Sequence, residues 1–390
     1  MLALPAIMAV SSSLRKFLGT WTRKDQNVKA TDSPLPPLAR RVCASAVRVC
    51  RGTTWLAILG LAFTLTSLAE PRLEVLELSS RVLKKNPLGD PVTRRVAVFT
   101  PDQATNGVPL PIVYYLPGFG GSSENAIKDP ARWIKTSAEL AQAGTPVILA
   151  IVDAKTRWGG SQYLNSAAQG KYADYICDEI VPLVERHCRI APGVTNRIIA
   201  GHSSGGLGAL RLGMLRPRLF GGVVALSPDS YFEISHRYLV TKPSVTNFSL
   251  ADLQALVKAP PGSPPPKDGD LKYAVALSAA YAPRGRWHPG EFDWLCDAQG
   301  QPREDVWKRW LNNDPLILVQ KHRHAFRDQQ AIYVEGPTQD SYKANEGARK
   351  IYEVLRGRPT CCTFYEPVGK HSDHMPERLE RGLAWVFGRL

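Results

Sequence analysis

The sequence predicts an α/β protein with a mostly parallel central sheet, helices on both faces of that sheet and a lid-like insertion late in the chain. Two observations support this prediction. Short, β-branched apolar runs alternate with segments of helical periodicity over most of residues 70–390. Residues 230–330 interrupt the alternation and include the proline-rich tract Ala259–Pro266, which must be an extended surface loop. We therefore expect one domain over residues 70–390, preceded by a leader over residues 1–69.

The expected elements follow one another along the chain as in other doubly covered sheets. Strands are predicted at Arg72–Ser80, Arg94–Pro101, Pro111–Leu116, Val147–Val152, Ile198–Ala200, Val223–Leu226, Ala331–Val334 and Thr363–Tyr365. Helices are predicted at Ala138–Ala143, Tyr172–His187, Gly206–Leu215, Tyr342–Leu355 and Met375–Leu390. Because ligands bind beyond the carboxyl ends of parallel strands, the loops that follow these strands should share one functional edge.

The charge balance of the chain first suggests a nucleic-acid partner, since the net charge is +14. Residues 1–69 account for half of that charge, with nine Lys and Arg against two Asp and Glu, or +7. The other +7 is spread over the remaining residues without a dense basic stripe interleaved with aromatic side chains. We therefore expect no nucleic-acid partner.

The leader contains an uncharged apolar run, Trp55–Leu68, which follows several arginines. It ends at Ser67-Leu68-Ala69, a small-x-small pattern typical of signal-peptide cleavage. The run is short for a membrane span and has the length of a signal-peptide core. We expect an exported protein, periplasmic or secreted, that contacts a membrane only through this segment if the segment stays uncleaved.

The segment Gly201-His202-Ser203-Ser204-Gly205 lies between a predicted strand and a predicted helix. This is the G-x-S-x-G pattern of a nucleophile elbow, in which a sharp turn exposes the serine hydroxyl and leaves no room for a Cβ at the flanking glycines. A serine hydroxyl is a poor nucleophile at neutral pH and needs a base aimed at it. Ser203 is therefore the predicted nucleophile of an acyl-transfer site.

Acyl chemistry also requires two hydrogen-bond donors for the developing oxyanion. The backbone amide of Ser204 is the first candidate because it directly follows the nucleophile. The second should come from Pro117–Gly121, a glycine-rich loop that follows an apolar strand. We predict the amide of Phe119, with Gly118 and Gly120 as alternatives.

The predicted base is His371, which follows the last strand in a Gly-x-His context. His374 should fall at the start of the final helix, and the His-x-x-His spacing lacks the third ligand that a metal site needs, so no metal is expected. The acid that orients the imidazole should follow a strand between serine and histidine. Asp340 fits best, Asp229 is the second candidate, and Glu335 lies too close to its strand.

The order Ser203, Asp340, His371 is that of α/β-hydrolases. The chain resembles the esterase D-type branch of that superfamily, which includes S-formylglutathione hydrolases, feruloyl and acetyl-xylan esterases, enterobactin esterases and mycolyltransferases. The resemblance covers roughly Pro111–Leu390 and departs at Pro117, where a histidine is common. It rests on YYLPGFGG, YADYICDEIVPLVERHCRI, RIIAGHSSGGLGAL and VVALSPDS, and on the Asp340 and His371 loops.

The resemblance implies the α/β-hydrolase fold and an exported serine esterase that uses these three residues and needs no cofactor. Its partner would be a small-molecule or glycan-linked ester. Two alternatives stay open: an acyltransferase with the same triad, and a non-catalytic binding module on a hydrolase scaffold. The tryptophans of the insertion could form a substrate wall or the core of the insertion itself: Trp287, Trp294, Trp307 and Trp310.

The cysteines do not define a disulfide pattern. Five of the seven lie outside the leader, so an odd count remains. Cys177 and Cys188 fall on one predicted helix, where eleven residues at the helical rise separate them by about 16 Å. That separation is too long for a disulfide between them. We expect most of these cysteines to be small buried hydrophobic residues.

Overall fold

The computed structural model describes residues 71–322, Phe326, residues 330–358 and residues 360–390. The predicted leader with its apolar run lies outside the described residues. The limits of the predicted domain therefore stay a prediction. Among the residues that are described, no helix is both long and apolar enough to cross a membrane.

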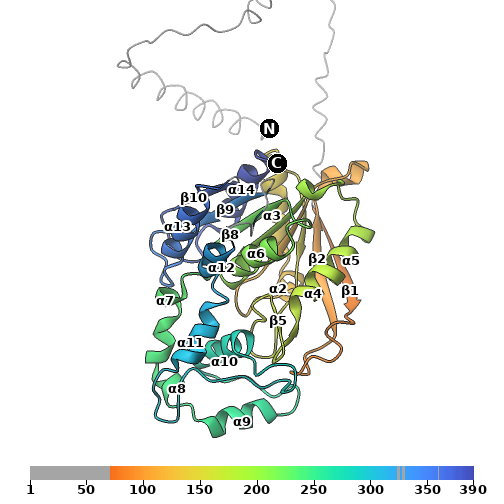
Figure 1. Cartoon of the computed structure of the whole chain (residues 1–390). Helices are drawn as coiled ribbons and strands as arrows, with labels where there is room; N and C mark the ends of the chain where they lie inside the picture. The colour runs from red at the N-terminus through yellow and green to blue at the C-terminus, as the bar shows by residue number, and fades with distance from the viewer. Residues whose placement is uncertain (1–70, 323–325, 327–329, 359) are drawn as a thin grey trace, which may run out of the picture. The chain divides into compact units, whose positions relative to one another are not determined.

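The core of the fold is an eight-stranded sheet with the order β1-β2-β4-β3-β7-β8-β9-β10 (Figure 1). β1 pairs antiparallel with β2, and β2 pairs antiparallel with β4, whereas every pairing from β4 to β10 is parallel. The mostly parallel sheet is thus confirmed. The strands are β1 Arg72–Ser79, β2 Thr93–Thr100, β3 Ile112–Leu116, β4 Ile148–Ile151, β7 Arg197–His202, β8 Gly222–Leu226, β9 Ala331–Glu335 and β10 Cys361–Tyr365. A separate two-stranded hairpin joins β5 (Asn165–Ser166) to β6 (Gly170–Lys171).

Helices cover both faces of the sheet, as predicted. The first face carries α3 (Ala131–Gln142) and α14 (Met375–Phe387), whose apolar side chains share one core cluster with strand residues such as Val113 and Val224. The opposite face carries α5 (Val181–His187), α6 (Ser204–Leu215) and α13 (Ala344–Leu355), which pack in a second cluster. The short α2 (Ser123–Lys128) precedes α3.

The predicted helix Tyr172–His187 has a break in its regular geometry. It begins as α4 (Tyr172–Asp174), continues as a π-helical turn over Tyr175–Ile180 and resumes as α5. Pro182 lies in the first turn of α5, where its ring would clash with the carbonyl four residues earlier in a regular α-helix. The wider turn before Pro182 relieves that clash.

The described cysteines are free thiols. Burial raises the pKa of Cys177 to about 12 and that of Cys188 to about 11. Both thiols therefore stay protonated at neutral pH and are poor nucleophiles, as expected of cysteines that pack as small hydrophobic residues.

The insertion forms a small helical layer at one end of the sheet (Figure 1). The proline-rich tract is the loop between α9 and α10, as predicted. The helices of the insertion are α7 Phe232–Ser235, α8 Pro243–Thr246, α9 Leu250–Lys258, α10 Gly269–Tyr281, α11 Glu304–Leu311 and α12 Pro315–Lys321.

The insertion has an apolar core of its own. Trp294, Trp307 and Trp310 are buried there, around the inner side of α10. Trp287 is instead 78% exposed. The interpretation of these tryptophans as a core is therefore right for three of the four, and none of the four lines the pocket described below.

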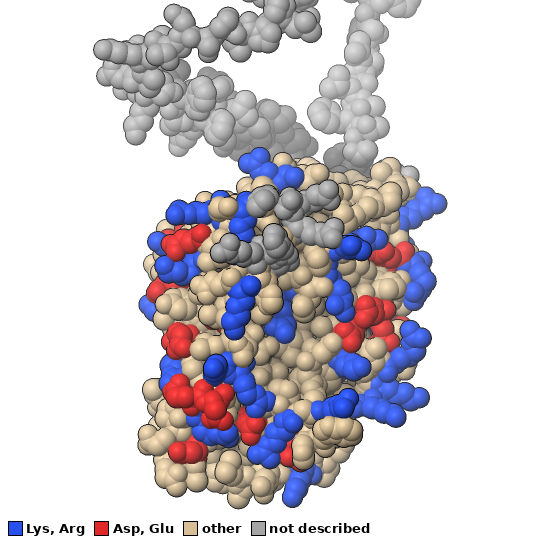
Figure 2. All heavy atoms as spheres, viewed as in Figure 1, with Lys and Arg blue, Asp and Glu red and all other residues tan. Residues whose placement is uncertain are grey.

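Basic and acidic side chains are interspersed on the face of the protein shown in Figure 2. Many of them are paired there or elsewhere on the surface of the described part, as in Arg216 with Asp174 and Arg349 with Glu366. The displayed face thus offers no continuous basic stripe for a nucleic-acid backbone.

Candidate active site

Ser203 occupies the sharp turn between β7 and α6. Its backbone has φ 58° and ψ −122°, a conformation that side-chain-bearing residues rarely adopt. The amide of Ser203 donates to the carbonyl of Leu226 at 3.0 Å, which holds the turn against β8. Because α6 begins at Ser204, the amide of Ser204 belongs to the first helical turn and has no partner within the helix. These are the features of a nucleophile elbow.

The glycines on either side of the elbow are required by close backbone approach. A Cβ at Gly205 would lie 1.8 Å from the carbonyl oxygen of Leu116, and one at Gly201 would lie 2.2 Å from the carbonyl oxygen of Gly205. Neither contact is possible for a real Cβ, and both involve backbone rather than a movable side chain. The turn can therefore form only with glycine at these two positions.

Replacement of Gly205 by alanine is expected to destabilise the protein by about 3 kcal/mol or more, because the strand and the helix must separate to admit the methyl group. Urea unfolding followed by circular dichroism measures this effect. Gly357→Ala is the matched control, since its added methyl meets no heavy atom within 4 Å. Equal midpoints for the two variants would contradict the steric explanation of the elbow.

His371 and Asp340 are brought together although they follow different strands. The Nδ1 atom of His371 lies 2.7 Å from Oδ2 of Asp340. Burial alone would raise the pKa of Asp340, but the hydrogen bond and charge of His371 and the amides of Tyr342 and Ala344 together lower it. Asp340 is thus a carboxylate at neutral pH and fixes the imidazole orientation.

The backbone of His371 is held by three donors. Its carbonyl oxygen accepts hydrogen bonds from Nη1 of Arg378 at 3.0 Å, Nε2 of His202 at 3.0 Å and Oγ of Ser227 at 3.2 Å. Arg378 is buried and also forms an ion pair with Glu335. Glu335 therefore serves to hold this arginine, which explains its place at the end of β9.

His202 lies against His371, with ring centroids 4.7 Å apart. Burial and the neighbouring His371 lower the pKa of His202 to about 3. His202 is therefore a neutral donor through Nε2 at neutral pH. This imidazole could not be assigned to the site from the sequence, because nothing in its local pattern shows which backbone group it contacts.

His202 is expected to make folding stability depend on pH. Its pKa is about 3 in the folded state and about 6.5 in an unfolded chain, so the unfolded state binds more protons between these values. The contribution of neutral His202 to the free energy of unfolding is complete above pH 6.5. As the pH decreases, this contribution is lost, by about 2 kcal/mol between pH 7 and pH 5. Urea unfolding at both values should show this fall in the wild type and a smaller one in His202→Gln, which keeps a donor. An equal fall in the free energy of unfolding of the wild type and His202→Gln would contradict the assignment of this pH dependence to His202.

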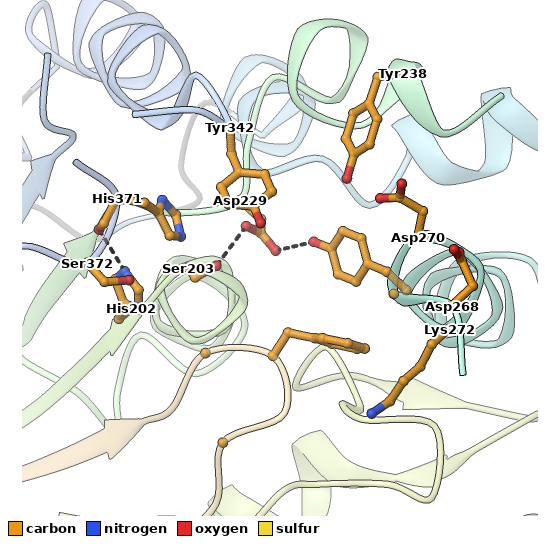
Figure 3. A pocket seen from close by; sticks show the side chains of 15 residues that line it. His202, Ser203, Asp229, Tyr238, Asp268, Asp270, Lys272, Tyr342, His371 and Ser372 are labelled. Atoms are coloured by element: carbon orange, nitrogen blue, oxygen red, sulfur yellow. Dashed lines mark hydrogen bonds between the residues drawn. The ribbon is translucent and has the colours of Figure 1, made fainter. Parts of the chain in front are cut away.

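The Ser203 hydroxyl donates to Oδ1 of Asp229 at 3.3 Å rather than to His371. Figure 3 shows Ser203 between His371 and Asp229. Nε2 of His371 is buried and has no hydrogen-bond partner among the described residues. A rotation of the serine side chain about its Cα–Cβ bond would aim the hydroxyl away from Asp229, and hydrogen bonds of this kind often tighten only when substrate binds. Of the two predicted acids, Asp340 contacts the imidazole and Asp229 contacts the serine.

The loop after β3 supplies the second group of predicted donors. The amide of Gly120 is engaged, since it donates to the carbonyl of Gly159 at 3.1 Å. For the amides of Phe119, Gly118 and Ser204, no acceptor occurs within the described residues. Phe119 and Gly118 both line the pocket, so they remain as candidates and Gly120 does not.

A pocket of about 710 Å³ opens above Ser203. One wall includes the predicted residues Ser203, Asp229 and His371, and the other comes from the insertion: Tyr238, Asp268, Gly269, Asp270, Lys272 and Tyr273. This second wall has no signal in the sequence, since the start of α10 reaches the pocket only through tertiary packing. His374, which directly precedes α14, does not line the pocket, and no group of three potential metal ligands is clustered in the described part of the chain.

Residues 91–359 match the family model described as "Putative esterase". The chain belongs to this esterase family. It is accordingly a carboxylic ester hydrolase, and the resemblance inferred from the sequence is confirmed.

Solved structures share the fold of this esterase. A ferulic acid esterase aligns over 82% of this chain and 99% of its own, at 18% identity and a TM-score of 0.53. The serine hydrolase FphF of Staphylococcus aureus aligns over 82% and 99%, at 16% identity and a TM-score of 0.51. An S-formylglutathione hydrolase from Agrobacterium tumefaciens aligns over 82% and 96%, at 18% identity and a TM-score of 0.50.

Proposed function

We propose that this esterase is a serine hydrolase in which Ser203 attacks the ester carbonyl, His371 transfers the proton and Asp340 orients the imidazole. The observation that supports this most directly is the 2.7 Å contact between His371 and Asp340. The other imidazole nitrogen is buried in the same pocket as Ser203 and has no hydrogen-bond partner in the described part of the chain. The amides of Phe119 and Ser204 are the proposed oxyanion donors.

The chemistry proceeds in two halves. In the first, a bond forms between Oγ of Ser203 and the carbonyl carbon while Nε2 of His371 takes the hydroxyl proton. The imidazolium then gives that proton to the leaving oxygen as the ester C–O bond breaks, which releases the alcohol and leaves the acyl-enzyme. In the second, His371 takes a proton from water, which attacks the acyl-enzyme. As the bond between Oγ of Ser203 and the acyl carbon breaks, the imidazolium of His371 returns the proton to that oxygen and the acid is released.

A fluorophosphonate probe tests the proposed nucleophile. The wild type should gain the mass of one phosphonyl group on the peptide that contains Ser203, and Ser203→Ala should gain none. Ser263→Ala, in the proline-rich tract outside the pocket, is the control and should be labelled as the wild type is. Labelling that persists in Ser203→Ala would overturn the proposal.

We also propose that the protein is exported, periplasmic or secreted, on the basis of the apolar run Trp55–Leu68 and the Ser67-Leu68-Ala69 pattern. Mass spectrometry of the mature N-terminus, on protein recovered from each cell fraction, tests this. A first residue of Glu70 in an exported fraction is the expected result. Protein that is found only in the cytoplasm and that keeps an intact leader would contradict the proposed export.

A further inference from the structure

The carboxyl group of Asp229 is an unassigned feature of the pocket. Asp229 is 6% exposed, and its Oδ1 lies 3.3 Å from Oγ of Ser203. Its other oxygen, Oδ2, accepts a hydrogen bond from the hydroxyl of Tyr273 at 2.8 Å. Both partners are neutral hydroxyl groups. A second acid thus lies beside the proposed nucleophile without taking part in orienting the imidazole.

No cation of the described residues neutralises Asp229. The nearest basic group along its hydrogen-bond chain is His236, whose Nε2 lies 3.2 Å from the Tyr273 hydroxyl. Burial lowers the pKa of His236, so that this imidazole is neutral at pH 7. The amine of Lys272 lies 6.0 Å from the ring centroid of Phe119, and Figure 3 shows the lysine pointing away from Asp229.

The other acids of the pocket have partners that occupy them. Asp270 forms an ion pair with Lys242 at 3.3 Å. Asp268 caps α10, since its Oδ1 accepts a hydrogen bond from the backbone amide of Leu271 at 2.8 Å. Asp229 is therefore the acid of the pocket that is buried and bonded, within the described residues, only to neutral hydroxyl groups. A buried carboxyl group without a cation is costly, and a cationic ligand would offset that cost.

The direction of attack decides which part of an ester would reach Asp229. His371 must lie beside the leaving oxygen in order to protonate it, and the amides of the elbow and of the loop after β3 must lie beside the carbonyl oxygen. In Figure 3, His371 and Asp229 lie on different sides of the Ser203 hydroxyl. With the leaving oxygen beside His371 and the carbonyl oxygen beside the amides, the remaining substituent of the carbonyl carbon, the acyl group, can extend toward Asp229. Reacting atoms are about 3 Å apart before attack, so a substituent on the carbon next to the carbonyl comes within hydrogen-bond reach of Oδ1.

We infer that Asp229 selects esters whose acyl group carries an ammonium group next to the carbonyl, that is, aminoacyl esters. The ammonium would donate a charge-assisted hydrogen bond to Asp229. The aromatic rings of Phe119 and Tyr273, which contact each other edge to face with centroids 4.8 Å apart, line the same pocket and suit a cation. This inference depends on the proposed role of Ser203 as nucleophile.

The test compares benzyl esters that share a leaving group and differ at one substituent. Alanine, lactate and propionate benzyl esters carry an ammonium, a hydroxyl and a hydrogen beside the carbonyl. Release of benzyl alcohol at pH 6.5, where an α-amino group is protonated, gives kcat/KM for each. The wild type should prefer the alanine over the propionate ester by about 10-fold or more, with the lactate ester between them. In Asp229→Asn that ratio should fall by about 10- to 100-fold.

Asp305→Asn is the matched control, because Asp305 is exposed on α11 and does not line the pocket. It should keep the wild-type ratio. A wild-type ratio of one or less, or an unchanged ratio in Asp229→Asn, would overturn the inference. An equal loss on all three esters in Asp229→Asn leaves the ratio unchanged and would assign Asp229 a structural or catalytic role. Failure of the proposed function is recognised separately, by activity that survives in Ser203→Ala.

Discussion

Ser203→Ala is expected to lower kcat by about 10⁴- to 10⁶-fold on any ester that this protein hydrolyses, because alanine lacks the hydroxyl that we propose forms the acyl-enzyme. The serine is placed by a strained backbone between β7 and α6, with its hydroxyl in the pocket, and alanine fits that backbone without a new contact. The loss should therefore appear in kcat, with folding unchanged by circular dichroism. Initial rates on benzyl propionate, with the variant expressed in a strain that lacks other esterases, measure it.

The partner of Ser203 supplies the control for this experiment. His371→Ala should lose nearly as much activity, and the double variant should lose little more than either single one, because the two residues act as a unit. Additive losses would show that the two side chains act independently. A Ser203→Ala protein within 10-fold of the wild type would rule out this serine as the nucleophile.

Asp340→Asn is expected to lower kcat by about 10⁴-fold, since an asparagine in place of the carboxylate favours the wrong tautomer of His371. The same geometry is retained, because the amide replaces a carboxyl oxygen that lies 2.7 Å from Nδ1. The variant should fold normally by circular dichroism. Initial rates at a saturating concentration of a neutral ester measure the loss of kcat.

The second acid of the pocket provides the comparison. Asp229 contacts the serine and Tyr273 but not the imidazole. Asp229→Asn should therefore lower kcat on benzyl propionate far less than Asp340→Asn does. A larger loss of kcat in Asp229→Asn than in Asp340→Asn would identify Asp229 as the triad acid. This pair of variants therefore decides between the two acids that the sequence left open.

The strands were predictable because each is a short run whose composition suits a buried parallel strand. Ile198–Ala200 and Ala331–Val334 were both placed within the observed strands, which extend slightly further at their ends. Helix starts were harder. The predicted helix at Ala138–Ala143 in fact begins at Ala131, directly after Pro130, whose backbone angles are already helical and which has no amide for the first turn to leave unpaired.

The elbow was predictable because its glycines have a local cause, the close approach of backbone atoms within one turn. The far wall of the pocket had no such signal. Tyr273 reaches the site because α10 packs on the core of the insertion, and no pattern within α10 encodes that placement. For the same reason the three donors that hold the carbonyl of His371, including Arg378, could not be found from spacing alone.

The insertion has a practical consequence for engineering. Trp294 and Trp310 give it an interior separate from the packed faces of the sheet, and α10 presents its first turn to the pocket. Residues 268–272 could therefore be randomised in a mutant library, or exchanged for the corresponding stretch of a homologue, while Tyr273 is kept because it holds Asp229 beside Ser203. Selection from such a library would change the substrate specificity while the residues proposed to break the ester bond are retained.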